Sequence, residues 1–134
     1  MPYNVTWLYP KRVILAEAIG NVTIEELIEA VQTLGLMLET AQAPVYMISD
    51  SKGIKSYPNQ VARVSSAVNA LKTHGHKLGE ILMVDTNPII RFIANIVTQV
   101  VISTHSRSVN SVEDAITYLR KVDKSFNDAE WISV

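Results

Sequence analysis

The spacing of apolar residues predicts a β-hairpin followed by a helix at the start of the chain. Residues 3–8 alternate loosely between apolar and polar and, like residues 13–16, are rich in strand-forming side chains. Thr23 and Glu26 have the spacing of a capping box, in which each side chain binds the backbone N–H of the other. Apolar residues then recur at helical spacing, and Gly35 is expected to end or bend this helix.

The rest of the chain alternates between short apolar runs and helical spacing, which is typical of α/β proteins with crossover helices. The predicted elements are a strand over 44–50, a loop over 51–58, a helix over 58–75, a strand over 80–85, a helix over 87–100, a strand within 101–110, and a helix over 111–122 that directs Leu119 and Val122 inward. The order is ββαβαβαβα, so we expect a sheet of about five strands that the N-terminal hairpin makes mixed. Residues 1–124 are predicted to form a single domain, followed by a tail over 125–134 with Trp131 as its anchor.

The composition is that of an ordinary globular domain. The chain has 134 residues, 48% hydrophobic and 19% charged, and its 12 Lys and Arg against 13 Asp and Glu give a net charge of −1. This balance argues against a generally basic nucleic-acid-binding protein. Because there is no cysteine, disulfide scaffolds, thiolate metal sites and Cys nucleophiles are excluded. No signal peptide, membrane-length apolar run or lipidation motif is visible, so we expect a cytoplasmic protein without a transmembrane segment.

Three short stretches resemble one known family. They are Gly20-Asn21-Val22-Thr23 before the first helix, the strand Val45–Asp50, and the helix start Ser111-Val112-Glu113-Asp114-Ala115. Together with the hairpin, they resemble the SpoIIAA-like, or STAS-type, domains, which include the anti-sigma-factor antagonists. The resemblance covers residues 3–123 and implies this family's α/β architecture and a regulatory role exerted through protein contacts.

The best-known functional feature of that family is a phosphorylatable Ser at the start of the second helix. Here that helix start reads Tyr57-Pro58-Asn59-Gln60, so no Ser stands at the matching place. The stretch Asp50-Ser51-Lys52-Gly53 is similar in composition, but it follows the preceding strand directly. The chain therefore resembles the uncharacterised branch of SpoIIAA-like proteins, likened to lipid-binding modules, more than the phosphorylated branch.

Asp50 and Asp85 are candidates for chemistry, because each ends a predicted parallel strand, where α/β proteins form ligand crevices. Two carboxylates at one rim can bind a cation or share acid–base work, but Asp is also common at strand ends and caps. His74 and His76, with the distant His105, fit a solvated helix C-terminus better than a metal site. A small hydrolase using the two acids and a His is a third hypothesis. Because no Gly-x-Ser-x-Gly motif is present, we expect no enzyme activity, and we expect no metal or cofactor.

Charged residues are unevenly distributed along the chain. Segment 51–79 contains cations and no acid, whereas the first helix region carries Glu25, Glu26, Glu29 and Glu39; the cations are Lys52, Lys55, Arg63, Lys72 and Lys77. This pattern fits complementary docking surfaces or an anion site near Lys52 and Lys55, and it also fits two solvated helix faces. Aromatic residues do not alternate with these lysines, so no nucleic-acid partner is expected. The candidate ligand or partner surface is Asp50, Ser51, Lys52, Lys55, Ser56 and Asp85.

The helix predicted over 87–100 is apolar around most of its circumference. A helix on one sheet face needs a single apolar stripe, so something else must cover the remaining apolar residues. The cover is the C-terminal tail with Trp131, a second subunit, or an apolar ligand. The candidate interface residues are Ile90, Phe92, Ile93 and Val97.

These patterns lead to two functional hypotheses besides the hydrolase. The first is a non-catalytic regulatory or protein-interaction module that acts as a homodimer. The alternative is a carrier or sensor of a small apolar or anionic ligand, held near the 50–55 loop and the 87–100 helix.

Overall fold

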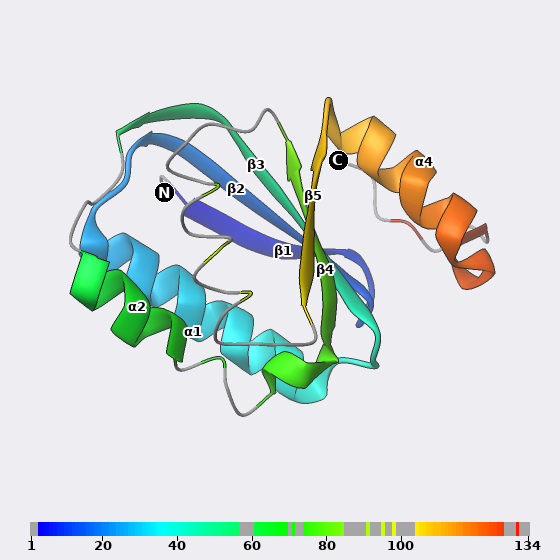
Figure 1. Ribbon diagram of the computed structural model, residues 1–134, viewed down its shortest axis with the longest axis horizontal. Helices are drawn as coiled ribbons and strands as arrows, with labels where there is room; N and C mark the ends of the chain where they lie inside the picture. The colour runs from blue at the N-terminus through cyan, green and yellow to red at the C-terminus, as the bar shows by residue number, and fades with distance from the viewer. Residues whose placement is uncertain are drawn as a thin grey trace.

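The computed structural model has one mixed five-stranded sheet with helices on both faces (Figure 1). The structure describes residues 3–56, 61–69, 71, 74–84, 91, 95, 98, 104–127 and 131. The strands lie side by side in chain order: β1 (Tyr3–Tyr9), β2 (Val13–Asn21), β3 (Val45–Ser56), β4 (Leu78–Val84) and β5 (His105–Val109). β1 is antiparallel to β2 and the other neighbours are parallel, so the predicted α/β fold with a mixed sheet is confirmed.

The helices form one layer on each face of the sheet. α1 (Ile24–Thr40) and α2 (Val61–Asn69) lie on one face, and α4 (Val112–Val122) lies on the other (Figure 1). Two short 3₁₀ turns, η1 (Gly75–Lys77) and η2 (Lys124–Asn127), precede β4 and follow α4. Residues 91, 95 and 98 are helical, within the predicted helix over 87–100. In the part of the chain that the structure describes, no helix is long and apolar enough to cross a bilayer.

Two apolar cores form because successive side chains of a strand point to opposite faces of the sheet. The core on the α1 and α2 side joins strands to both helices through Ile14, Val45, Ile81, Leu27, Leu34, Val64 and Val68. The core on the α4 side contains Val13, Leu15, Ile48, Leu82, Val84, Ala115, Leu119 and Phe126.

α1 begins where the capping box predicts it. The backbone N–H of Thr23 donates to Glu26 Oε1 at 2.9 Å, and that of Glu26 donates to Thr23 Oγ1 at 3.2 Å. The helix does not end at Gly35 but continues to Thr40. Beyond Gly35, Lys77 Nζ donates at 2.9–3.1 Å to the carbonyl oxygens of Leu38, Glu39 and Ala41. A cation there adds a donor to carbonyl groups at the helix end, of which that of Leu38 also accepts from the Ala41 backbone N–H at 3.2 Å, and it interacts favourably with the helix dipole.

β3 is longer than predicted and replaces most of the predicted loop. The sequence pattern ends this strand at Asp50, but the structure continues it to Ser56. β4 ends at Val84, beside Asp50, so among the described residues the last part of β3 pairs with β2 alone, with two shifts of register. A strand segment with one neighbour accommodates exposed polar residues such as Lys52 and Lys55. Such residues are also typical of loops, which is why the sequence pattern predicted a loop here.

The segment predicted as a tail contributes to the core on the α4 side. Phe126 is fully buried, and Trp131 Nε1 donates to its carbonyl oxygen at 2.8 Å. The Tyr9 ring centroid lies 5.1 Å from that of Phe126 and 5.3 Å from that of Trp131, both edge-to-face. Trp131 is therefore an anchor, as predicted. Val122, predicted to point inward, is 51% exposed, because the chain leaves the helix there and Phe126 enters the core instead.

Candidate functional site

β1 is an edge strand, and its outer side has no neighbouring strand among the described residues. Its seven residues, YNVTWLY, include no charged side chain and no proline. Soluble proteins usually protect edge strands with such residues, because unpaired backbone N–H and C=O groups bind other strands. β1 carries neither kind of protection, which makes it a candidate binding surface.

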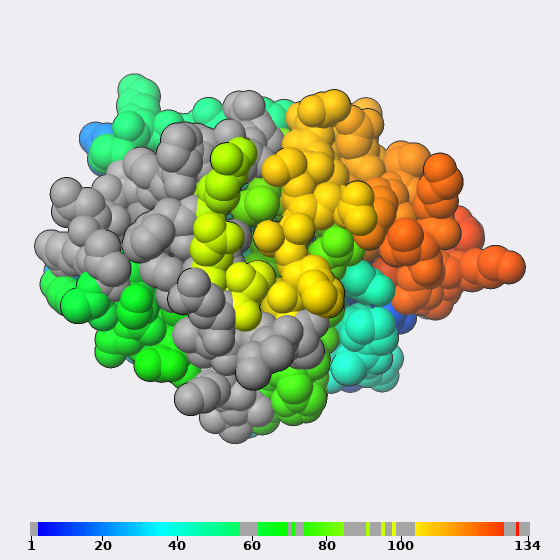
Figure 2. Space-filling view, in the orientation of Figure 1, coloured from blue at the N-terminus to red at the C-terminus, as the bar shows by residue number. Residues whose placement is uncertain are grey.

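The opposite edge strand, β5, is built differently. Four of its five residues are exposed, and Figure 2 shows the strand at the molecular surface. Arg107 Nε donates to Glu80 Oε2 at 3.3 Å, and the guanidinium carbon lies 4.4 Å from the centroid of the Tyr118 ring. Tyr118 Oη donates to Glu80 Oε1 at 2.9 Å, and burial, together with this hydrogen bond, raises the pKa of Tyr118. A charged cluster of this kind discourages strand pairing at β5.

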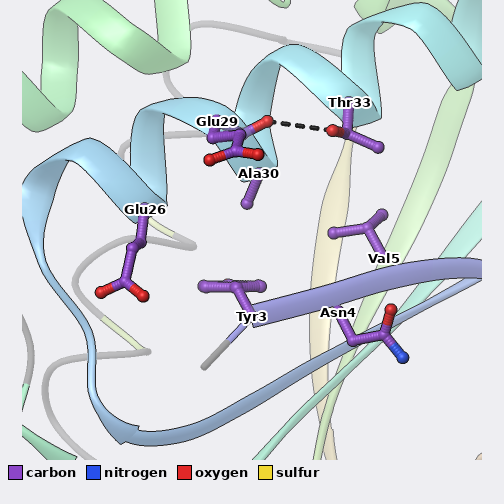
Figure 3. A pocket seen from close by; sticks show the side chains of 7 residues that line it. All are labelled: Tyr3, Asn4, Val5, Glu26, Glu29, Ala30 and Thr33. Atoms are coloured by element: carbon purple, nitrogen blue, oxygen red, sulfur yellow. Dashed lines mark hydrogen bonds between the residues drawn. The ribbon is translucent and has the colours of Figure 1, made fainter. Parts of the chain in front are cut away.

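A groove of about 190 Å³ lies between β1 and α1 (Figure 3). β1 contributes Tyr3, Asn4 and Val5 to its lining. α1 contributes residues spaced three to four apart, so they form one stripe of the helix: Glu26, Glu29, Ala30 and Thr33. In Figure 3, Ala30 faces the Tyr3 ring, and both Glu side chains project from this side of α1. The outer edge of the sheet and an acidic helix stripe therefore face one groove.

The two ends of β1 differ in charge. At the Tyr3 end, the Glu26 carboxylate is engaged by the capping box, whereas the exposed Glu29 carboxylate has no hydrogen bond or ion pair with any other described residue. Beyond the Tyr9 end, exposed Lys11 occupies the turn into β2 with φ 63°. The strand is thus acidic beside its first residue and basic just after its last.

A smaller apolar cavity of about 60 Å³ lies between α1, α2 and the sheet. Tyr3, Val5 and Ala30 line both this cavity and the groove. Val31 lines both the cavity and a second groove, of about 300 Å³, between α1 and α2. The small side chain of Ala16 also borders this space, so α1 rests on the sheet with unfilled apolar volume beneath it.

The charged residues predicted to form a ligand surface lie on the last part of β3. Asp50 is half-buried, and its Oδ1 accepts from the backbone N–H of Lys52 at 3.2 Å. Lys52 and Lys55 are exposed and make no ion pair with another described residue. Asp85, the remaining acid of the predicted surface, lies outside the described residues.

The two serines of this surface have different environments. Ser56 Oγ donates to Asn21 Oδ1 at 2.8 Å and thereby ties the end of β3 to β2. Ser51 is 2% exposed, and its Oγ has no hydrogen-bond partner within the described ranges of the chain. Leaving a buried hydroxyl unpaired is unfavourable, which marks Ser51 as the unusual member of the set.

Asp50 and the histidines lie at different levels of the sheet. Asp50 is paired with the last residue of β4, whereas His105 is paired with its third residue, and His74 and His76 precede the strand. Four residues of strand separate the two levels, which corresponds to about 13 Å. The structure therefore gives no support to a hydrolytic pairing of Asp50 with a His. Among the residues described, no three His, Cys, Asp or Glu side chains are grouped as metal ligands.

The described cations of segment 51–79 have different environments. Lys77 binds the end of α1, as described above, so it is a structural residue. Arg63 lines the groove between α1 and α2, and Lys72 lies outside the described residues. Lys52 and Lys55 both lie on the last part of β3.

The predicted interface residues Ile90, Phe92, Ile93 and Val97 lie outside the described residues. Arg91 and Asn95, two polar residues of the same predicted helix, are exposed. Sequence reasoning assigned no function to β1. The feature that points to it is a run of seven uncharged, strand-forming residues at what proves to be a sheet edge.

Comparisons with known proteins concern the fold. No protein-family model and no curated protein sequence matches the chain. Among solved structures, an uncharacterised DUF3478-family protein with a SpoIIAA-like fold, from Shewanella loihica PV-4, is similar, with a TM-score of 0.56 and 11% sequence identity. The match covers 87% of this chain and 91% of that chain. The chain therefore has a SpoIIAA-like fold, as the resemblance implied.

Proposed function

We propose that the protein is a non-catalytic regulatory module that acts by binding protein, and that it works as a homodimer. The observation that carries this proposal is the uncharged edge strand β1, which has no second neighbouring strand among the described residues. An edge strand offers a row of backbone donors and acceptors to any strand laid beside it, and pockets for alternate side chains give specificity. The groove beside α1 is such a pocket.

The helix predicted over 87–100 is a second source of support for self-association. Its polar residues Arg91 and Asn95 are exposed, so the apolar residues predicted around the rest of this helix need a cover. Ile90, Phe92, Ile93 and Val97 remain the candidate interface on this helix.

Native mass spectrometry over a range of protein concentrations tests the proposal. A dimer mass without an adduct is expected, and Phe92→Glu should reduce the dimer if this helix forms the interface. A folded protein that stays monomeric at the highest accessible concentration would contradict the homodimer.

The second candidate function is a carrier of a small apolar ligand, and the cavity under α1 favours it. Such a ligand should raise the unfolding temperature, because it binds only the folded state. Because the cavity holds only about 60 Å³, the probe is a small apolar atom such as xenon. Ala30→Leu should abolish the shift by filling the cavity, whereas Glu39→Leu, at an exposed position of the same helix, should leave it unchanged. Absence of any shift in the wild type would count against this function.

The polar set Asp50, Ser51, Lys52, Lys55, Ser56 and Asp85 remains the candidate surface for an anionic ligand.

A further inference from the structure

We infer that the groove between β1 and α1 binds a small primary amine, with its ammonium group at Glu29 and Glu26 and a short alkyl tail on the groove floor (Figure 3). The site is built from side chains of a single copy of the chain, so it does not depend on the proposed homodimer. Three properties of the groove define this ligand: its charge, its apolar floor and its depth.

The charge of the groove selects a cation. Glu26 and Glu29 are the charged residues among its described lining, which contains no cation. Glu26 Oε1 accepts from the backbone N–H of Thr23, whereas the exposed Glu29 carboxylate has no hydrogen bond or ion pair with another described residue. Residues three apart on a helix are neighbours, and an ammonium group donates three hydrogen bonds, so one such group can contact both carboxylates.

The floor of the groove is apolar and aromatic, which favours an organic ammonium ion over a metal ion. Tyr3 and Val5 of β1 and Ala30 of α1 form this floor, and the two β1 residues also pack against the core on the α1 side. A metal ion gains nothing from these groups, whereas an alkyl tail gains free energy when it leaves water for them. In Figure 3 the Tyr3 ring lies across the groove from Ala30, and the faces of such rings also attract cations.

The depth of the groove limits the length of the tail. The groove holds about 190 Å³, and the cavity of about 60 Å³ beneath α1 lies behind it. Tyr3, Val5 and Ala30 line both spaces, so a tail on the groove floor lies against the wall of the cavity, whose far side is formed by core residues such as Leu27 and Leu34. These volumes suit a tail of a few carbon atoms, and n-butylammonium is a ligand of this size.

n-Butylammonium is the probe, and three matched compounds isolate the properties of the site. In ¹H–¹⁵N spectra of the full chain, the probe should shift the backbone amides of Val5, Ala30 and Thr33, which line the groove. Methylammonium keeps the charge without the tail and should bind about tenfold more weakly, because it lacks the methylene groups that leave water. 1-Butanol keeps the tail without the charge and should bind about threefold to tenfold more weakly. Butyrate reverses the charge and should cause no shift at these amides.

Variants of three glutamates on α1 locate the ammonium group. Glu29→Gln should raise the dissociation constant of n-butylammonium by about threefold to fivefold, because it removes an exposed ion pair. Glu26→Gln should also weaken binding, and its amide oxygen preserves the capping box. Glu39→Gln removes a charge from an exposed position of the same helix outside the groove, so it is the matched control and should leave the constant unchanged. Circular dichroism establishes that each variant is folded.

The outcomes separate this inference from the proposed function. Equal binding of n-butylammonium and 1-butanol, or any binding of butyrate in the groove, would overturn the inference, because the site would not recognise a positive charge. Equal effects of Glu29→Gln and Glu39→Gln would also overturn it, because they would reflect general attraction to an acidic helix. A dimer that does not bind n-butylammonium leaves the proposed homodimer standing without this site. A monomer that binds the amine in the expected order overturns the homodimer and supports the site.

Discussion

Arg12 and Asp123 form an ion pair in which Nη2 lies 2.8 Å from Oδ2, and it joins the first hairpin to the end of α4. Arg12 also donates from Nε to the carbonyl oxygen of Pro44 at 2.9 Å, and its guanidinium carbon lies 4.6 Å from the centroid of the Phe126 ring. Asp123 accepts from the Ser125 hydroxyl at 2.7 Å. One arginine therefore links the hairpin, the approach to β3 and the C-terminal segment.

Asp123 should make stability depend on pH. The Ser125 hydroxyl, its backbone N–H and Arg12 lower the pKa of Asp123 against the opposing effect of burial. A carboxyl group with a lowered folded-state pKa stabilises the protein above its unfolded-state pKa, about 3.9, and this contribution is lost as pH falls through the folded-state pKa. Asp123→Asn should lower the free energy of unfolding by about 1 kcal/mol at neutral pH, since the group is partly exposed.

Urea unfolding from neutral pH to below pH 3 measures this effect. The difference between wild type and Asp123→Asn should shrink as the carboxyl group becomes protonated. A difference that stays constant with pH would show that the ionised carboxylate is not its source. Combining the variant with Arg12→Met should give less than the sum of the two single effects, because the residues interact directly.

Phe126 should contribute strongly to stability, although it lies in the segment expected to be a tail. Phe126→Ala removes a fully buried ring and should lower the free energy of unfolding by about 3–5 kcal/mol. Val122→Ala, at an exposed apolar position of the same region, should cost less than about 0.5 kcal/mol. Chemical denaturation of both variants checks this, and equal small effects would show that the segment does not hold the α4 side of the core together.

Lys77 should stabilise the end of α1. Lys77→Met leaves the carbonyl groups of Leu38, Glu39 and Ala41 without this donor and should lower the free energy of unfolding by about 1–2 kcal/mol. Lys55→Met, at an exposed cation, is the matched control and should be nearly neutral. Amide hydrogen exchange should increase in the last turn of α1 only for the first variant. Unchanged exchange there would contradict the capping role.

The sequence predicted the elements that depend on local patterns. The capping box at Thr23, the Ser111 cap of α4 and the buried strand beginning at Val45 are all present, because cap spacing and apolar runs are local properties. The resulting order of strands and helices was enough to predict the mixed sheet. Handedness and packing rules allow few other arrangements for such an order.

The remaining features depend on which elements become neighbours. β3 continues past Asp50 because β2 is long enough to pair with it after β4 has ended, and no local pattern around Lys52 or Gly53 reveals that. The candidate role of β1 likewise needs its position at the sheet edge. Its lack of charge is visible in the sequence, but this points to a binding surface only once the structure shows no described strand on its outer side.

The contact of Tyr9 with Phe126 and Trp131 has a consequence for how the protein is made. Synthesis delivers the hairpin first, and the described residues that cover its α4 side from α4 and η2 come a hundred positions or more later. Until those residues have been synthesised, they cannot pack against Leu8, Val13 and Leu15. The nascent chain therefore presents an apolar sheet face for most of its translation, and the protein should depend on chaperones more than its small size suggests.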